Sequence, residues 1–201
     1  ANINVQSELG LRHSIGNNLG EITIKGDAIN DEAGDAYFAT KDITITNSAS
    51  QDITLKRPYG KLRVIATDLA ELNLNVEPKF VEVSYTAAHP VAFNAVTGEI
   101  EGEQTTTNYK YEYAEISKLN LANHVYTKGY DEKKATNANG VKRHTHMTLF
   151  TDYILAEKEG QTPYHFTMTV YGKNGSSDEI KTTEFNTDIP VERNKLTTVL
   201  G

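Results

Sequence analysis

The stretch at residues 166–185, FTMTVYGKNGSSDEIKTTEF, decides the fold class. In residues 166–170, three apolar side chains fall on one face of an extended chain and two threonines on the other. A period of two is typical of a β-strand with one buried and one exposed face. The turn-forming run at residues 173–177 follows, and residues 179–185 again favour a strand. The stretch therefore predicts an antiparallel β-hairpin.

Further strand-type segments recur at short intervals along the chain. They lie at residues 43–46, 53–56, 62–65, 81–85, 109–113 and 141–156. Helical patterns at residues 68–72 and 114–119 are shorter than the roughly 10–12 residues of an ordinary helix. Since crossover helices are missing, a parallel α/β fold is disfavoured. The pattern predicts an all-β, antiparallel sandwich.

The composition is that of an acidic globular chain without cysteine. Its 201 residues hold 27 Asp+Glu against 20 Lys+Arg, a formal net charge of −7. An acidic chain neutralises phosphates poorly, so no nucleic-acid partner is expected. No apolar run reaches the roughly 18 residues of a membrane span. Without cysteine, disulfides and thiolate sites are excluded.

Catalytic signatures are missing from the sequence. It contains no Gly-x-Ser-x-Gly, no phosphate loop, no His-Glu-x-x-His and no Gly-x-Gly-x-x-Gly. We therefore expect no enzymatic activity, no catalytic residue and no cofactor.

Three clusters could bind a ligand, and each has an ordinary structural interpretation. His144 and His146 share a strand face and could chelate Zn²⁺ or Cu²⁺, but no third ligand is identifiable. Residues 27–35 are rich in the oxygen ligands that Ca²⁺ takes, but their spacing departs from the EF-hand pattern. An exposed strand face and a solvated turn are preferred, and no metal is assigned. Tyr109, Tyr111 and Tyr113 could stack on sugars or a protein, although a buried core face is preferred.

Four segments, in order, carry a resemblance to a known family. They are DAYFA at residues 35–39, ITLKRPYGKLRV at 53–64, FNAVTG at 93–98 and DIPVERNKLTTVLG at 188–201. Together they resemble the fimbrillin-like surface lipoproteins of Bacteroidales, a group of major fimbrial subunits with their tip and anchor relatives. The Leu-Lys-Arg-Pro-aromatic-x-Lys and Ile-Pro-Val-x-Arg-Asn segments are moderately specific in combination.

The resemblance implies two transthyretin-like, antiparallel β-sandwich (Greek-key) domains. Residues 1–70 would form the N-terminal domain, which is short for a complete seven-stranded sandwich. Its first 20 residues show one clear strand candidate, at residues 3–6. Residues 71–201 would form the C-terminal domain, with further strands expected after it. Family members are exported lipoproteins, so we expect an extracellular, cell-surface location with membrane contact only through a lipid anchor on the precursor.

The resemblance also implies a function in fimbrial assembly and adhesion. After proteolytic processing, a strand from a neighbouring subunit fills an opened groove, where main-chain hydrogen bonds give affinity and alternate side chains give register. Such head-to-tail contacts make a filament because they do not close on themselves. The expected partners are other fimbrial subunits and a host protein or glycan. The alternative is a surface glycan-binding β-sandwich that does not polymerise and that uses the three tyrosines and calcium at residues 27–35.

Seven residues are assigned to assembly: Arg57, Pro58, Tyr59, Arg193, Asn194, Val199 and Leu200. Pro58 lacks an N–H and belongs at a strand end or edge. The first three residues are expected to turn the chain across the domain junction, with an ordinary surface turn as the alternative. The next two would cap or staple the following strand, and the last two would begin a groove-filling segment.

Overall fold

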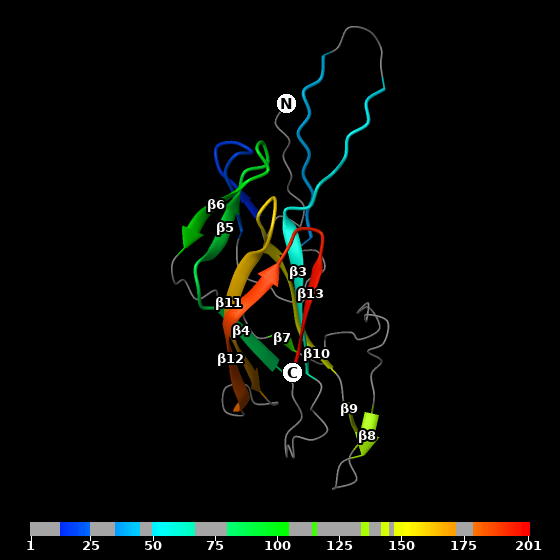
Figure 1. Cartoon of the computed structure of the whole chain (residues 1–201), viewed down its shortest axis with the longest axis vertical. Helices are drawn as coiled ribbons and strands as arrows, with labels where there is room; N and C mark the ends of the chain where they lie inside the picture. The colour runs from blue at the N-terminus through cyan, green and yellow to red at the C-terminus, as the bar shows by residue number, and fades with distance from the viewer. Residues whose placement is uncertain are drawn as a thin grey trace.

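The computed structural model describes residues 13–24, 35–44, 50–66, 80–104, 114–115, 134–136, 142–144, 147–171 and 179–201. These residues form strands, turns and loops and no helix (Figure 1), so none of them lies in a helix able to cross a bilayer. The strands are β1 (His13–Ile15), β2 (Ile22–Ile24), β3 (Tyr59–Ala66), β4 (Phe80–Tyr85), β5 (His89–Phe93), β6 (Ile100–Gln104), β7 (Ala114–Glu115), β8 (Lys134–Thr136), β9 (Lys142–His144), β10 (Met147–Leu155), β11 (Thr162–Tyr171), β12 (Glu179–Val191) and β13 (Leu196–Leu200). The predicted all-β class is confirmed.

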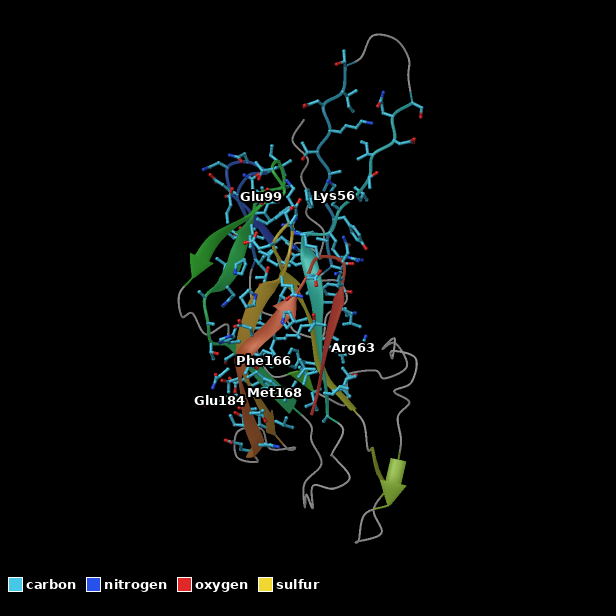
Figure 2. All side chains as sticks on the ribbon, viewed as in Figure 1. Lys56, Arg63, Glu99, Phe166, Met168 and Glu184 are labelled. Carbon is cyan, nitrogen blue, oxygen red and sulfur yellow. The ribbon has the colours of Figure 1, made fainter. Side chains whose placement is uncertain are left out.

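Two sheets share the main hydrophobic core. One has the strand order β10-β3-β13 and the other β12-β11-β4-β7. Val64 from β3, Val83 from β4, Phe150 from β10 and Phe166 from β11 are all at most 3% exposed within it. Buried side chains alternate along β11, and β11 pairs antiparallel with β12, so the predicted hairpin is confirmed. Figure 2 shows Phe166 and Met168 on this strand near the middle of the molecule.

A second core lies where a third sheet meets the first long strand. This sheet has the order β1-β2-β5-β6. Its Phe93 packs with Tyr59 at the start of β3 and with Tyr153 and Leu155 at the end of β10. Half-buried Phe38 joins the same cluster, with its ring centroid 4.7 Å from that of Phe93. The second core therefore fixes the start of β3, where the candidate site lies.

Two sheets join strands from the two sides of residue 70. β3 pairs with β10 and β13, and β2 pairs with β5. The predicted domain boundary falls within residues 67–79, outside the described residues, as do the strand candidate at 3–6 and the helical turn at 68–72. Ala114–Glu115, the first residues of the other helical candidate, form β7 paired with β4.

The last strand pairs parallel to the first long one. In β13, Leu196 lies opposite Lys61 and Leu200 opposite Ile65 in a parallel register. The other paired strands described are antiparallel, which makes this ladder the exception. Figure 1 shows β13 beside β3, near the C-terminus. Among the described strands β13 has one neighbour and forms an edge of its sheet.

The predicted strand at residues 53–56 is wrong, and residues 43–44, the described half of the one at 43–46, form no strand. Residues 41–44 and 50–55 contain no strand, and a single bridge between Phe38 and Lys56 joins the two arms. In Figure 1 these two arms project beyond the sandwich. Ile53 and Leu55 are consequently 53% and 62% exposed, because the arms have no core to cover. Alternation predicts a strand only where a second layer buries one of its faces.

Candidate functional site

Two of the four segments that carry the family resemblance, residues 53–64 and 188–201, meet at the start of β3. The Asn194 N–H donates to the Tyr59 carbonyl oxygen over 3.0 Å, and Arg57 Nη1 donates to Asn194 Oδ1 over 3.4 Å. The Pro58 carbonyl oxygen accepts from the Ala156 N–H, and Arg193 Nε donates to the Ala156 carbonyl oxygen over 2.7 Å. Five of the seven predicted assembly residues therefore form one connected site.

A tight turn at residues 192–195 builds one side of this site. Its Asn194 has a φ of 59°, a left-handed conformation that asparagine tolerates better than most residues. The Lys195 N–H closes the turn on the Glu192 carbonyl oxygen over 3.2 Å. The turn carries the chain from β12 in one sheet to β13 in the other, so Arg193 and Asn194 lie immediately before the final strand.

Arg57 is held in place by a bidentate ion pair with Asp35. Its Nε and Nη2 each lie 2.7 Å from a different Asp35 carboxylate oxygen, and Nη2 also donates to the Tyr37 hydroxyl. The hydrogen bond with Asp35 raises the pKa of Arg57 above its ordinary value, against a smaller effect of burial. Asp35 ends the segment predicted as a candidate calcium loop. Its carboxylate is bound to Arg57, and residues 27–34 lie outside the described residues.

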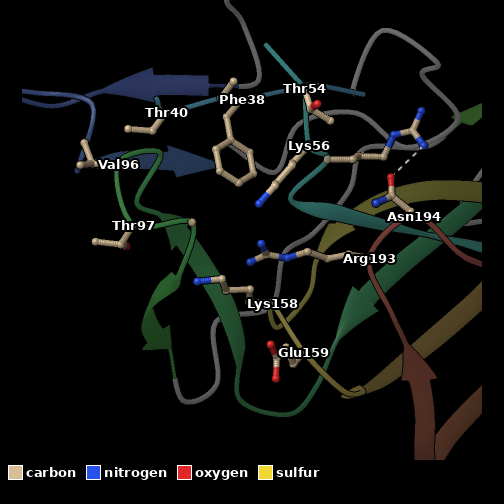
Figure 3. Close-up of a pocket in the computed structure, with 13 residues that line it drawn as sticks. Phe38, Thr40, Thr54, Lys56, Val96, Thr97, Lys158, Glu159, Arg193 and Asn194 are labelled. Atoms are coloured by element: carbon tan, nitrogen blue, oxygen red, sulfur yellow. Dashed lines mark hydrogen bonds between the residues drawn. The ribbon is translucent and has the colours of Figure 1, made fainter. Parts of the chain in front are cut away.

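A cleft of about 500 Å³ opens beside the turn (Figure 3). Four segments line it: the projecting arms with Phe38 and Lys56, the turn between β5 and β6 with Thr97, the loop after β10 with Lys158, and the turn at residues 192–195 with Arg193. Figure 3 shows the Phe38 ring and the ends of the three cationic side chains pointing toward the same space. Lys56 and Lys158 were not singled out from the sequence, since nothing in it places residues 56, 158 and 193 together.

Arg193 is the most enclosed cation of the cleft. Its guanidinium carbon lies 5.7 Å from the centroid of the Phe93 ring. Burial lowers the pKa of Arg193 below its ordinary value, and the negative charges of Glu99 and Glu157 oppose that effect. Its Nη2 is buried without a hydrogen-bond partner among the described residues. A buried donor without a partner is costly, so this nitrogen marks a point where an acceptor would be stabilised.

The other two predicted assembly residues lie in β13. Val199 is half-buried, sits opposite Val64 and packs against the main core. Leu200 points to the opposite face of its sheet and is 46% exposed. The two residues thus have different surroundings, although they are neighbours in sequence.

The remaining candidate clusters lie largely outside the described residues. This holds for Tyr109, Tyr111 and Tyr113 and for His146, while His144 is placed as the last residue of β9. Within the described part of the chain, no three histidine or carboxylate side chains are grouped so that they could hold a metal ion.

Fold and site define a protein of layered β-sheets in which the parallel strand β13 and a cationic turn meet the first long strand. The chain belongs to DUF6562, a family of unknown function whose sequence model matches residues 11–201. No curated protein matches the chain.

Proposed function

We propose that this protein is a structural and adhesive subunit of a cell-surface fimbria, assembled by β-strand donation between subunits after proteolytic processing. The proposal includes transthyretin-like sandwich topology, export as a lipoprotein and other fimbrial subunits as partners, with no catalysed reaction. The observation that carries it is the placement of β13, the last strand described, which pairs parallel with β3 at the edge of its sheet.

The bonding of β13 suits a strand that can be exchanged. Its ladder runs from the Lys61 N–H, which donates to the Lys195 carbonyl oxygen over 2.9 Å, to the Gly201 N–H, which donates to the Ile65 carbonyl oxygen over 3.1 Å. Each such bond contributes about 0.5–1.5 kcal/mol net. An identical strand from another copy would form the same bonds, so exchange costs little at equilibrium and can propagate from subunit to subunit.

The turn at residues 192–195 supports the proposal as the point where β13 would swing away. It joins β12 to β13. Arg193 is hydrogen-bonded to the backbone of Ala156, just after β10, and Asn194 to the backbone of Tyr59, the first residue of β3. A donated strand would thus leave from a fixed anchor. This gives a physical role to the Ile-Pro-Val-x-Arg-Asn segment that carries the resemblance.

A surface glycan-binding protein that does not polymerise is the second candidate. The cationic cleft beside Phe38 favours it, since aromatic rings next to polar groups are common in ligand sites. The three tyrosines and residues 27–34 of the acidic loop, which the sequence suggests for this role, lie outside the described residues.

The assembly proposal is tested by limited digestion of the intact chain with an arginine-specific protease. Native mass spectrometry and negative-stain microscopy then report the assembly state before and after cleavage. We expect ladders of whole-number multiples and filaments after cleavage only. A cleaved protein that stays folded and monomeric would contradict the proposal, and Lys181→Gln, an exposed change on β12, serves as a variant that should assemble normally.

A further inference from the structure

The cleft at the turn is lined mainly by positive charges, whereas the whole protein carries a negative net charge. The chain carries a formal net charge of −7, yet four cationic side chains line the cleft: Lys56, Arg57, Lys158 and Arg193. Among the residues lining it, Glu159 is the one carboxylate. Like charges brought together repel each other, which favours an anion between them.

Two of these cations are already neutralised by carboxylates outside the cleft lining. Arg57 is bound to Asp35, and Lys158 Nζ lies 3.1 Å from Glu99 Oε1 in an exposed pair. The other two are available. Lys56 forms no ion pair with a described residue, and Arg193 keeps its buried Nη2 without a partner there. Both point into the cleft in Figure 3.

We propose that this cleft binds an acidic saccharide, with the sugar carboxylate between Lys56 and Arg193. A guanidinium with an unused donor is well suited to a carboxylate. The half-buried Phe38 ring offers an apolar surface to the sugar ring. The hydroxyls of Thr54 and Thr97, which also line the cleft, can exchange hydrogen bonds with sugar hydroxyls.

The shape of the site favours a sugar over an acidic peptide. Peptides are commonly recognised in extended form along a sheet edge or a long groove. Here the lining side chains surround one compact space, and its roughly 500 Å³ falls in the range of small-ligand sites. The inference does not depend on polymerisation, because no residue of β13 lines the cleft.

The test is titration calorimetry on the intact, uncleaved chain with four probes: glucuronic acid, N-acetylneuraminic acid, glucose and the dipeptide Glu-Glu. We expect at least one acidic sugar to bind, with glucose and the dipeptide at least tenfold weaker. Raising the salt concentration should weaken binding, because part of the attraction is ionic.

Two variants locate the site, and one matched control accompanies them. Lys56→Gln and Arg193→Gln should each weaken binding of the acidic sugar at least tenfold, whereas Lys181→Gln on β12 should not. If Arg193→Gln fails to fold by circular dichroism, Lys56→Gln decides, since Lys56 is exposed.

The inference is overturned if neither acidic sugar shows binding at concentrations up to about 10 mM. A dissociation constant above that concentration would be weaker than ordinary specific sites show. It is also overturned if glucose or Glu-Glu binds equally well, or if Lys56→Gln leaves affinity unchanged. The binding assay uses uncleaved protein, so its result is independent of the assembly experiment. A failure to bind sugar would not count against assembly, and a failure to assemble would not count against sugar binding.

Discussion

Gly60 is the residue that allows the start of β3 to approach the turn at residues 192–195 closely. A Cβ at this position would lie 2.4 Å from Val191 Cγ1 and 2.5 Å from the Glu192 carbonyl oxygen. The second contact is with backbone, which cannot rotate away. Glycine therefore allows the start of β3 to pass directly under the turn that leads into β13.

We predict that Gly60→Ala lowers the free energy of unfolding by about 1–3 kcal/mol, the usual cost of overpacking a fixed site. Chemical denaturation measures it. Gly201→Ala is the matched control, since a Cβ there meets nothing within 4 Å, and it should leave stability unchanged. Equal stability of the two variants would show that the turn and β3 can move apart.

His89 is a buried histidine at the start of β5. It is 5% exposed, its Nδ1 lies 2.8 Å from the Ala87 carbonyl oxygen, and its ring lies near those of Tyr85 and Tyr164. Burial lowers the pKa of His89 below its ordinary 6.5, and the bond to Ala87 opposes this more weakly. The unfolded chain therefore takes up this proton at a higher pH than the folded one.

We predict that stability falls as the pH drops below about 6.5, since protons then favour the unfolded chain. In His89→Gln the loss between pH 7 and pH 5 should be smaller. Denaturation curves at several pH values measure it. The same variant at pH 8, where the histidine is neutral in both states, isolates the packing cost. Parallel pH profiles for the two proteins would contradict the assignment.

At the level of elements, the two faces of β13 differ in burial, and both carry apolar side chains. Val199 packs on the main core, and Leu196 and Leu200 are 36% and 46% exposed on the other face. The strand is thus anchored by one apolar side chain and its main-chain ladder. An exposed edge with two leucines is a surface prone to association.

We predict that Val199→Asp weakens both folding stability and assembly, because it places a charge against the core. The loss of stability should be about 0.5–3 kcal/mol, the usual range for a destabilising substitution. Leu200→Asp should change stability by less than about 0.5 kcal/mol. Thermal unfolding and native mass spectrometry after cleavage measure both. If the two variants behave alike, the register of the donated strand differs from that of β13 on β3.

The elements show what a sequence pattern can and cannot predict. β11 and β12 followed from alternation plus a turn, because a two-layer core buries every second residue of β11. Residues 43–44 and 53–56 belong to segments with the same alternation, but they lie on the two projecting arms. Alternation alone carries no information on whether a second layer exists.

On the scale of the whole molecule, the site joins parts far apart in the chain. Arg57 and Asn194 are separated by 137 positions and share a hydrogen bond. Both were assigned to assembly from the resemblance, although their contact was not foreseen. The cleft could not be predicted, because Lys56, Lys158 and Arg193 converge only through the packing of three sheets.

The absence of cysteine in the chain makes a direct test of strand donation possible. Lys61 and Leu196 face each other across the parallel ladder, so Lys61→Cys with Leu196→Cys places two thiols on neighbouring strands. Oxidation would tie β13 to its own β3, and reduction would release it. Leu196→Cys alone controls for the substitution.

The decisive measurement is the assembly state of this double variant after arginine-specific cleavage, with and without reductant, by negative-stain microscopy and native mass spectrometry. The account predicts monomers when the disulfide is formed and ladders or filaments once it is reduced. Filaments that form equally well with the disulfide closed, or a reduced protein that stays monomeric while cleaved and folded, would contradict strand donation by β13.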